Sequence, residues 1–358
     1  MRRKGDLFER VTDIQNIRSA IVNAAKGVKK TPYIRKILLN TGENAEYVKT
    51  ILENGTYRVS GYKERVVMEP KRRVIHILPF FPDRIVQHAF IDVIGPDVFE
   101  KGFIFDSYAC RKGKGPHRGV LKAAYFARSS KYDLRYDIKG FYHNLDHEIL
   151  IGRIRRKIKD ERVVRVFEDI IESYRDKDTG SGCPIGNLTS QWFGNVYMDA
   201  LDHFVKDMLR VRKYIRYCDD FHIFGDSRVR LEEIDKRITE FVTCKLNLKF
   251  SKRMLTETKQ GVPFLGAIIF PDRVVMRRNT RDRIRRRIFG IGDVLDRDGE
   301  RLRIDRLFSM RGSVSSAIGT IKHLCSGDLA KKINLFSTSN KIDSLISNYE
   351  CGILTLNL

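Results

Sequence analysis

The chain has 358 residues, 42% of them hydrophobic and 32% charged, a balance typical of a folded globular protein that excludes a disordered chain. Lys and Arg outnumber Asp and Glu by 68 to 45, and the formal charge of +23 predicts a polyanionic partner. No apolar run approaches the ~18 residues of a membrane-spanning helix, so nucleic acid is favoured over a membrane. Scattered cysteines without a CxxC pair, and no apolar signal-peptide core after the basic start, predict a cytoplasmic protein.

The first third of the sequence predicts helices followed by extended chain. Residues 7–60 are expected to be mostly helical, because apolar positions recur between polar and charged ones. The stretch from Tyr57 to Met68 is expected to be extended, and Val74–Leu78 to form a strand. A helix with one buried face is expected from Asp83 and ends at Gly95-Pro96.

The central third alternates strands and helices. Strands are expected at residues 132–138 and 264–270, helices at 146–159 and 191–209, and a hairpin at 214–225. After Pro271 the sequence becomes strongly basic, with five arginines interleaved with isoleucines between residues 281 and 291. This spacing predicts a basic amphipathic helix, followed by a helix pair to about residue 341. Its arginines form either a solvated helix face or a surface that binds the phosphates of a nucleic-acid backbone.

The strongest local signal for chemistry is a pair of adjacent carboxylates, Asp219 and Asp220, at the turn of the expected hairpin. Adjacent carboxylates repel each other and are costly in a half-buried turn unless a cation neutralises them. A third carboxylate, Asp137, ends the strand expected upstream. A sheet that joins these strand ends would allow the three to hold two Mg²⁺ ions, with the Ile138 carbonyl as an extra ligand. Mn²⁺ is expected to substitute.

The ordered set of motifs over roughly residues 65–330 resembles the reverse transcriptases. The motifs begin with Pro70-Lys71-Arg72-Arg73 and Ser107-Tyr108-Ala109-Cys110-Arg111. Tyr136-Asp137-Ile138 and Ile185-Gly186-Asn187-Leu188-Thr189-Ser190-Gln191 follow. Tyr217-Cys218-Asp219-Asp220 and Phe264-Leu265-Gly266 complete the set.

This resemblance implies an α+β right-hand polymerase with fingers, palm and thumb, an antiparallel palm sheet and a helical thumb. It implies an N-terminal helical extension at residues 1–60, fingers and palm at 61–275, and a basic thumb with a C-terminal tail at 276–358. The implied activity is RNA-directed DNA synthesis from dNTPs with template RNA and cDNA as partners. Asp137, Asp219 and Asp220 become the catalytic residues.

The resemblance also implies roles for residues around the aspartates. The incoming dNTP would be bound by Arg73 and Lys71 and by Gly140, Phe141, Tyr142 and Gly186, with the Tyr142 ring excluding a 2′-hydroxyl. Template and primer would lie against Arg111, Ile185, Ser190, Gln191, Phe264, Leu265, Gly266, Arg283 and Arg286. Lys249 and Lys252 are candidates for the general acid that protonates pyrophosphate, although Met254 aligns with the lysine that the family often has there.

The form of the motif at residues 185–191, together with Glu69-Pro70-Lys71 and residues 83–89, resembles the enzymes of bacterial and phage diversity-generating retroelements. It also resembles defence-associated bacterial reverse transcriptases. The first would copy a template repeat with a small basic accessory protein, and the second would copy a dedicated non-coding RNA in antiphage defence. Two further alternatives are an inactive palm-fold protein that only scaffolds RNA and another two-metal palm enzyme such as a nucleotide cyclase.

Overall fold

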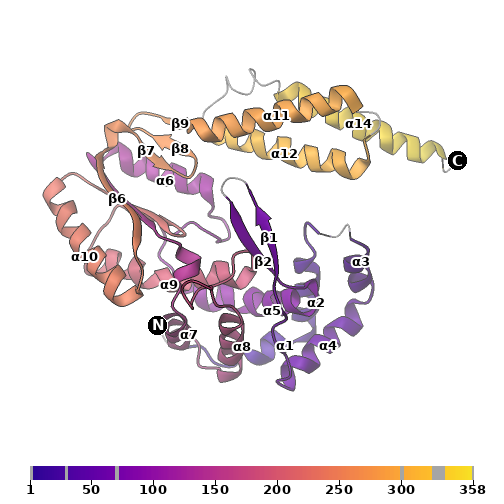
Figure 1. Ribbon diagram of the computed structural model, residues 1–358, viewed down its shortest axis with the longest axis horizontal. Coiled ribbons are helices and arrows are strands. Elements are labelled where there is room, and N and C mark those ends of the chain that lie inside the picture. Colours follow the sequence, from indigo (N-terminus) through magenta and orange to yellow (C-terminus); the bar gives the residue numbers. More distant parts are fainter. Residues whose placement is uncertain (1–2, 29–30, 69–71, 299–301, 325–334, 357–358) are drawn as a thin grey trace. The chain divides into compact units, whose positions relative to one another are not determined.

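The computed structural model describes residues 3–28, 31–68, 72–298, 302–324 and 335–356 (Figure 1). The chain forms two compact units, each built from separate stretches of sequence. The first comprises Met1–Gly113, Leu134–Ile223 and Arg228–Met254, and the second comprises Lys114–Asp133, Phe224–Ser227 and Leu255–Leu358. Of the predicted site residues, Lys71 lies outside the described residues.

The first unit is mainly helical. Its helices are α1 (Phe8–Thr12), α2 (Ile14–Ala24), α3 (Pro32–Leu39), α4 (Thr41–Glu53), α5 (Ile85–Ile94), α7 (His147–Lys157), α8 (Glu161–Glu172), α9 (Leu188–His203) and α10 (Arg228–Leu246). Helices α1 to α4 confirm the prediction for the N-terminal segment. The Asp13 carboxylate caps α2 by accepting hydrogen bonds from the amides of Gln15 and Asn16.

An aromatic cluster joins helices that are far apart in the sequence. The Phe167 ring on α8 lies with its centroid 5.5 Å from that of Phe90 on α5 and 5.4 Å from that of Phe193 on α9. All three rings are buried, and Phe99 adds a fourth ring, 6.1 Å from Phe167. Such aromatic burial is a large contribution to the stability of this core. It also fixes α9, whose first turn carries part of the predicted site.

Two sheets carry Arg73 and the predicted aspartates. Strands β1 (Lys63–Val67) and β2 (Arg73–Ile77) form an antiparallel ribbon. A four-stranded sheet has the order β4 (Tyr214–Tyr217), β5 (Asp220–Gly225), β3 (Tyr132–Ile138) and β6 (Phe250–Glu257). The β4–β5 hairpin pairs Tyr217 with Asp220, which leaves Cys218 and Asp219 as a two-residue loop. The predicted strand at 132–138 and the predicted hairpin are confirmed.

In the second unit a small sheet packs on a helix and is followed by three long helices. The sheet has the order β7 (Val262–Phe264), β8 (Ala267–Ile269) and β9 (Val274–Met276), and it packs on α6 (Pro116–Arg128). The long helices are α11 (Arg278–Asp298), α12 (Ile304–His323) and α14 (Leu335–Leu356). Ile284, Ile288, Ile291 and Leu295 of α11 are buried, which confirms the predicted amphipathic helix.

The prediction of one strand from Phe264 to Phe270 is wrong. Phe264 ends β7 and Ala267 begins β8, which runs back antiparallel to it. Between them Leu265 has φ 49° and Gly266 has φ 83°, both in the left-handed region. Two consecutive residues in this region reverse the chain, and an apolar pattern alone does not reveal such a tight turn.

Helices and antiparallel sheets together confirm the predicted α+β class. No helix in the described part of the chain is long and apolar enough to cross a membrane. The predicted aspartates lie near the end of β3 and in the β4–β5 hairpin.

Candidate active site

The sheet brings two of the predicted aspartates together. Asp137 lies near the end of β3, and Asp219 lies in the loop between β4 and β5, the strand next to β3. The pKa of Asp219 is raised to about 6, mainly by burial and also by the carboxylates of Asp137 and Asp220, whereas Arg73 lowers it. These interactions mean that the two carboxylates and the exposed Arg73 guanidinium from β2 lie within electrostatic reach of Asp219.

This donor set has the chemistry that Mg²⁺ prefers. Asp137 and Asp219 supply hard oxygen ligands, and a divalent cation would relieve the repulsion that helps to raise the pKa of Asp219. Within the described ranges, however, no group of three or more His, Cys, Asp or Glu side chains is arranged to hold a metal ion. Joint ligation by Asp137, Asp219 and Asp220 with the Ile138 carbonyl therefore stays a prediction.

Asp220 lies in a different environment from Asp219. Its Oδ1 is 3.6 Å from Nε of Arg135 on β3 and 3.4 Å from Nε2 of the buried His222 on β5. Successive residues of a strand point to opposite faces of a sheet, so neighbouring aspartates at a hairpin can face different partners. The two aspartates therefore have different neighbours. Asp219 interacts with Asp137, Asp220 and Arg73, whereas Asp220 also lies beside two basic side chains.

The loop that carries Asp219 is conformationally strained. Cys218 has φ 59°, a left-handed conformation that costs a residue with a side chain on the order of 1–3 kcal/mol. Two contacts hold it there. The Cys218 carbonyl accepts a hydrogen bond of 3.0 Å from Nη1 of Arg216, and its Sγ lies 3.3 Å from the Tyr142 hydroxyl.

Arg216 is the centre of a fully buried polar network under this loop. Its Nε and Nη2 donate to the Asp202 carboxylate of α9 at 2.7 and 2.6 Å, and the two side chains are 0% exposed. Nη1 also donates to Asn195 at 3.0 Å, and Nη2 to the Ser107 hydroxyl at 3.2 Å. Burial opposes the charge of Arg216, but Asp202 raises its pKa above the ordinary value. Neighbours on α9 and in the motif at residues 107–111 thereby fix the position of Cys218.

Tyr142 lies beside the same loop. Its ring is close to Gly194 of α9, because a Cβ atom added there would come within 3.4 Å of the ring. Burial raises the pKa of the Tyr142 hydroxyl far above its usual range, and the neighbouring Cys218 adds to this effect, so the hydroxyl stays protonated. Gly194 and Cys218 thus both lie against Tyr142, and Asp219 is within electrostatic reach of its hydroxyl. The role of the ring as a steric gate for the sugar stays a prediction.

The turn before Tyr142 also needs glycine. Gly140 has φ 54°, and a Cβ atom there would lie 2.8 Å from Nδ2 of Asn144. The Asn144 amide donates to the carbonyls of Lys139 and Gly140 at 3.1 and 2.9 Å, and Phe141 is buried. This compact turn directly follows β3. Binding of phosphates by the backbone amides of Gly140 and Phe141 stays a prediction.

Ser251 of β6 is a site residue that the sequence analysis missed. Its hydroxyl donates to both the carboxylate Oδ2 and the carbonyl of Asp137, the latter at 3.1 Å. The bond orients the Asp137 carboxylate from the side opposite β5.

Lys252 follows Ser251 and points to the other face of β6, whereas Lys249 lies just before the strand and its carbonyl accepts from Lys139. Both side chains are exposed, and the role of either lysine as general acid stays a prediction.

The predicted template motif at residues 185–191 packs against β2. The amide of His76 donates to the Ile185 carbonyl at 2.9 Å. Gly186 has φ 117°, and a Cβ atom there would lie 2.4 Å from Cγ2 of Ile75, so only glycine fits. Ser190 is buried and Gln191 exposed in the first turn of α9.

Arg111 ends the predicted motif at residues 107–111. Its Nε bonds to Glu100 at 2.8 Å and its Nη1 to the carbonyls of Ile104 and Ser107 at 2.6 and 2.9 Å. The Arg111 side chain is only 6% exposed. It therefore supports the loop that contains Ser107, and direct contact with a template stays a prediction.

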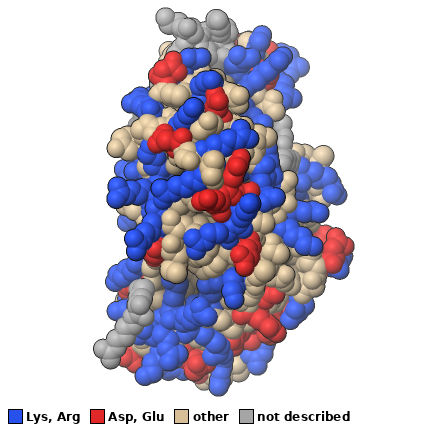
Figure 2. Space-filling view, turned by 90° about the vertical axis from the view of Figure 1, so that its left-hand side faces the viewer, with Lys and Arg blue, Asp and Glu red and all other residues tan. Residues whose placement is uncertain are grey.

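The remaining predicted residues lie in the second unit. Phe264 is buried, and Leu265 and Gly266 form the β7–β8 turn, with Gly266 facing Thr280 of α11. Arg283 and Arg286 are exposed on α11. Lys and Arg side chains also cover much of the face shown in Figure 2, with Asp and Glu in smaller groups between them.

The missed residues differ in the signals that they leave in the sequence. Arg216 stands among apolar residues in a short strand, an unusual place for a charge, and this signal could have predicted a buried partner. Ser251 and Asn195 leave no such signal. Their roles depend on which helix and strand pack beside the hairpin.

Comparison with known proteins identifies the family of the chain. The family described as reverse transcriptase (RNA-dependent DNA polymerase) matches residues 63–269, more than half of the chain. The chain belongs to the reverse transcriptase family. Its fold is therefore that of a right-hand polymerase, and the matched segment includes β1 and β2, all three aspartates and the β7–β8 turn.

Relatives in the family are distant. The chain is 23% identical to the group II intron-encoded protein LtrA of Lactococcus lactis, an alignment that covers 63% of this chain and 50% of that protein. It is 21% identical to protein YkfC of Escherichia coli, covering 53% of this chain and 61% of the relative. The chain thus spans about half the length of LtrA. Apo telomerase from Candida tropicalis aligns with a TM-score of 0.48 and 12% identity over 80% of this chain and 64% of that chain.

Replacing Arg216 should destabilise the protein strongly. Arg216→Met leaves the Asp202 carboxylate buried without its partner, and such a change typically costs about 3–5 kcal/mol in the free energy of unfolding. Urea denaturation measures this loss. Arg228→Met is the matched control, because it breaks an exposed ion pair with Glu232 and should change stability little. Equal effects of the two substitutions would contradict the structural role of the buried pair.

Proposed function

We propose that this chain is an RNA-directed DNA polymerase that extends a DNA primer on an RNA template by two-metal nucleotidyl transfer. The observation that carries the proposal is the convergence of Asp137, Asp219 and Arg73 at the strand ends inside the family segment. Two carboxylates for metal and one guanidinium for phosphate are the groups that transfer of a nucleotide from a triphosphate needs.

Each residue has a proposed task. Asp137 and Asp219 hold Mg²⁺, and Ser251 orients the Asp137 carboxylate. Asp220 contributes from its position beside Arg135. When bound, the ions lower the pKa of the primer 3′-hydroxyl and neutralise charge on the triphosphate and the leaving pyrophosphate. Arg73 binds the triphosphate through its planar guanidinium, and Lys71 assists it.

Further residues bind the sugar, the leaving group and the duplex. Tyr142 excludes a 2′-hydroxyl, and Lys249 protonates pyrophosphate, with Lys252 as the second candidate. The residues of the β7–β8 turn hold the primer end. We assign residues 276–358 to a thumb, and Arg283 and Arg286 to sequence-independent contacts with the phosphates of an RNA–DNA hybrid.

Removing one metal-binding carboxylate should abolish synthesis. Asp219→Asn keeps the size of the side chain but removes its charge, so primer extension on RNA with Mg²⁺ should fall by at least ~10³-fold, in line with the ~4 kcal/mol or more that such groups contribute. Asp272→Asn, at an exposed position beside Arg273, should retain full activity. Near-normal extension by Asp219→Asn, with unchanged thermal unfolding, would refute the two-metal assignment.

The size of Tyr142 should determine sugar selection. Tyr142→Ala removes the ring and should raise ribonucleotide incorporation relative to dNTPs by at least ~10-fold, because the proposed gate is steric. Tyr142→Phe keeps the ring, removes only the hydroxyl that faces Cys218, and should retain the selectivity. Single-nucleotide additions by the three proteins measure this. Equal selectivity in all three would show that the sugar is selected elsewhere.

For the biological setting we propose a diversity-generating retroelement, in which a template-repeat RNA is copied with errors at adenine and a small accessory protein takes part. Ile185 supports this proposal. It is half-buried next to β2, and its apolar side chain cannot supply the hydrogen bond that a glutamine could offer near the nascent base pair. One such bond contributes about 0.5–1.5 kcal/mol, a meaningful share of the discrimination between right and wrong pairs.

Changing Ile185 should therefore change fidelity. We expect Ile185→Gln to lower misincorporation several-fold, mostly opposite adenine, because it restores a polar contact. Deep sequencing of cDNA made by both proteins on one defined RNA measures the error rate, and Ile185→Leu controls for any change in packing. Accurate copying of adenine by the unaltered protein would favour the alternative, a defence-associated enzyme with a dedicated non-coding RNA.

A further inference from the structure

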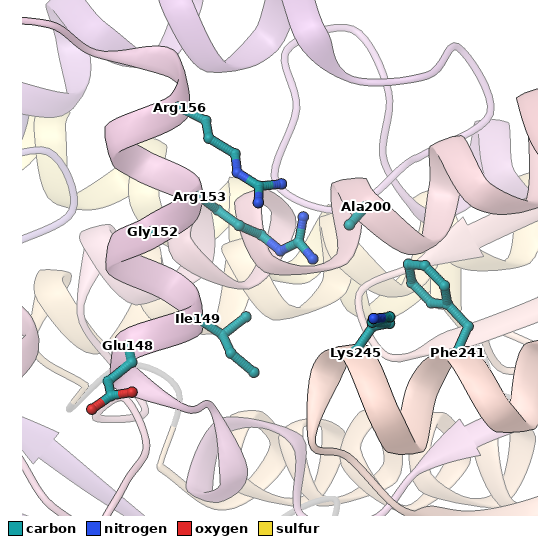
Figure 3. A pocket seen from close by; sticks show the side chains of 8 residues that line it. All are labelled: Glu148, Ile149, Gly152, Arg153, Arg156, Ala200, Phe241 and Lys245. Atoms are coloured by element: carbon teal, nitrogen blue, oxygen red, sulfur yellow. The ribbon is translucent and has the colours of Figure 1, made fainter.

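A pocket on the helical side of the first unit lies apart from the predicted active site. It has a volume of about 580 Å³ and lies between α7, α9 and α10 (Figure 3). Arg153 and Arg156 of α7 line one side, and Phe241 and Lys245 of α10 line the other. None of its lining residues is a predicted site residue.

Arg153 lies beside Arg156 in this pocket and is only partly neutralised, by Asp199. Nε of Arg153 is buried and, within the described part of the chain, has no hydrogen-bond partner. Burial lowers the pKa of Arg153, and the neighbouring charge of Arg156 lowers it further. A guanidinium held partly out of water beside a second one is a strong site for an anion that can bridge both.

Carboxylates near the pocket compensate only part of this charge. Figure 3 shows Glu148 with its carboxylate at the other end of the pocket from the two guanidinium groups. An adjoining pocket of about 620 Å³ shares Arg153 and Arg156 and contains Asp199. Asp199 is already paired with Lys157 at 2.7 Å.

The middle of the pocket is apolar. Ile149 of α7 and Ala200 of α9 line it, and Phe241 faces it from α10. The Phe241 ring stacks on Phe204, with centroids 4.2 Å apart and planes 12° apart, and is thereby held in place. A flat, rigid aromatic surface across the pocket from guanidinium groups suits a nucleobase and its phosphate better than it suits a bare anion.

We propose that this pocket binds a single-stranded RNA segment, separate from the stretch that is being copied. An unpaired base packs against Phe241 and Ile149, and the adjacent phosphates bind Arg153 and Arg156. The adjoining pocket extends the basic surface through Lys101 and Lys157, which gives room for a polynucleotide rather than a single nucleotide. That such a site would hold the RNA during synthesis rests on the proposed function. RNA binding by the pocket itself does not depend on the chemistry assigned to the aspartates.

The test uses the full chain with its polymerase site saturated by an RNA–DNA hybrid, and a fluorescent single-stranded oligoribonucleotide of about 12 residues as the probe. Arg153→Gln/Arg156→Gln should weaken probe binding at least 10-fold. It should also lower the slope of log Kd against log salt by about 1.4, or about 0.7 for each phosphate that the variant no longer neutralises. Primer extension on a preformed hybrid should stay within about 2-fold of the unaltered protein.

Two variants make the result specific. Arg165→Gln/Lys236→Gln removes the same charge from exposed positions on α8 and α10 outside the pocket, and should change binding by less than about 2-fold. Phe241→Leu keeps apolar bulk but removes the ring, and should weaken binding several-fold without changing the salt slope, because base stacking is not ionic.

Three outcomes would overturn the proposal. In the first, the pocket variant binds the probe as tightly as the charge-matched control. In the second, AMP displaces the probe at the concentration at which an unlabelled oligoribonucleotide does, so that the ligand is a free nucleotide. In the third, an acidic polypeptide displaces the probe and an unlabelled oligoribonucleotide does not. Loss of probe binding with normal primer extension supports the RNA site, whereas loss of extension alone bears only on the polymerase assignment.

Discussion

The buried ion pair of Arg216 and Asp202 is the interaction on which the candidate active site depends. A charge without solvent needs close partners, and those of Arg216 are side chains of α9, the Ser107 hydroxyl and the Cys218 carbonyl. Three segments that are distant in the sequence therefore meet at one guanidinium group. Because every donor has a defined acceptor, the hairpin loop has little freedom to change its conformation.

This constraint explains how a strained loop can persist next to repelling carboxylates. The left-handed conformation of Cys218 and the raised pKa of Asp219 are both unfavourable by themselves. The network and the aromatic core beneath it supply the compensating stability. Strain of this kind commonly collects at sites where geometry matters more than local stability, and here it lies next to Asp219, within electrostatic reach of Asp137.

The sequence alone predicted the elements whose signals are local. The alternating pattern of β3, the polar turn between β4 and β5, and the isoleucine spacing of α11 all specify structure within a few residues. The β7–β8 turn was missed, because its left-handed residues interrupt an otherwise continuous apolar run. Ser251 and the pocket of Arg153 could not be predicted, because they exist only where separate elements pack together.

The contact between Gly186 and Ile75 has a mechanical consequence. The loop at residues 185–187 and the β1–β2 ribbon are in van der Waals contact at this point, and the His76–Ile185 hydrogen bond lies beside it. Neither segment can shift alone without breaking that bond or separating the two surfaces. Since Arg73 begins the same ribbon, a displacement of the ribbon would be transmitted directly to Ile185. With the roles proposed for these two residues, nucleotide arrival and template position would become one coupled movement.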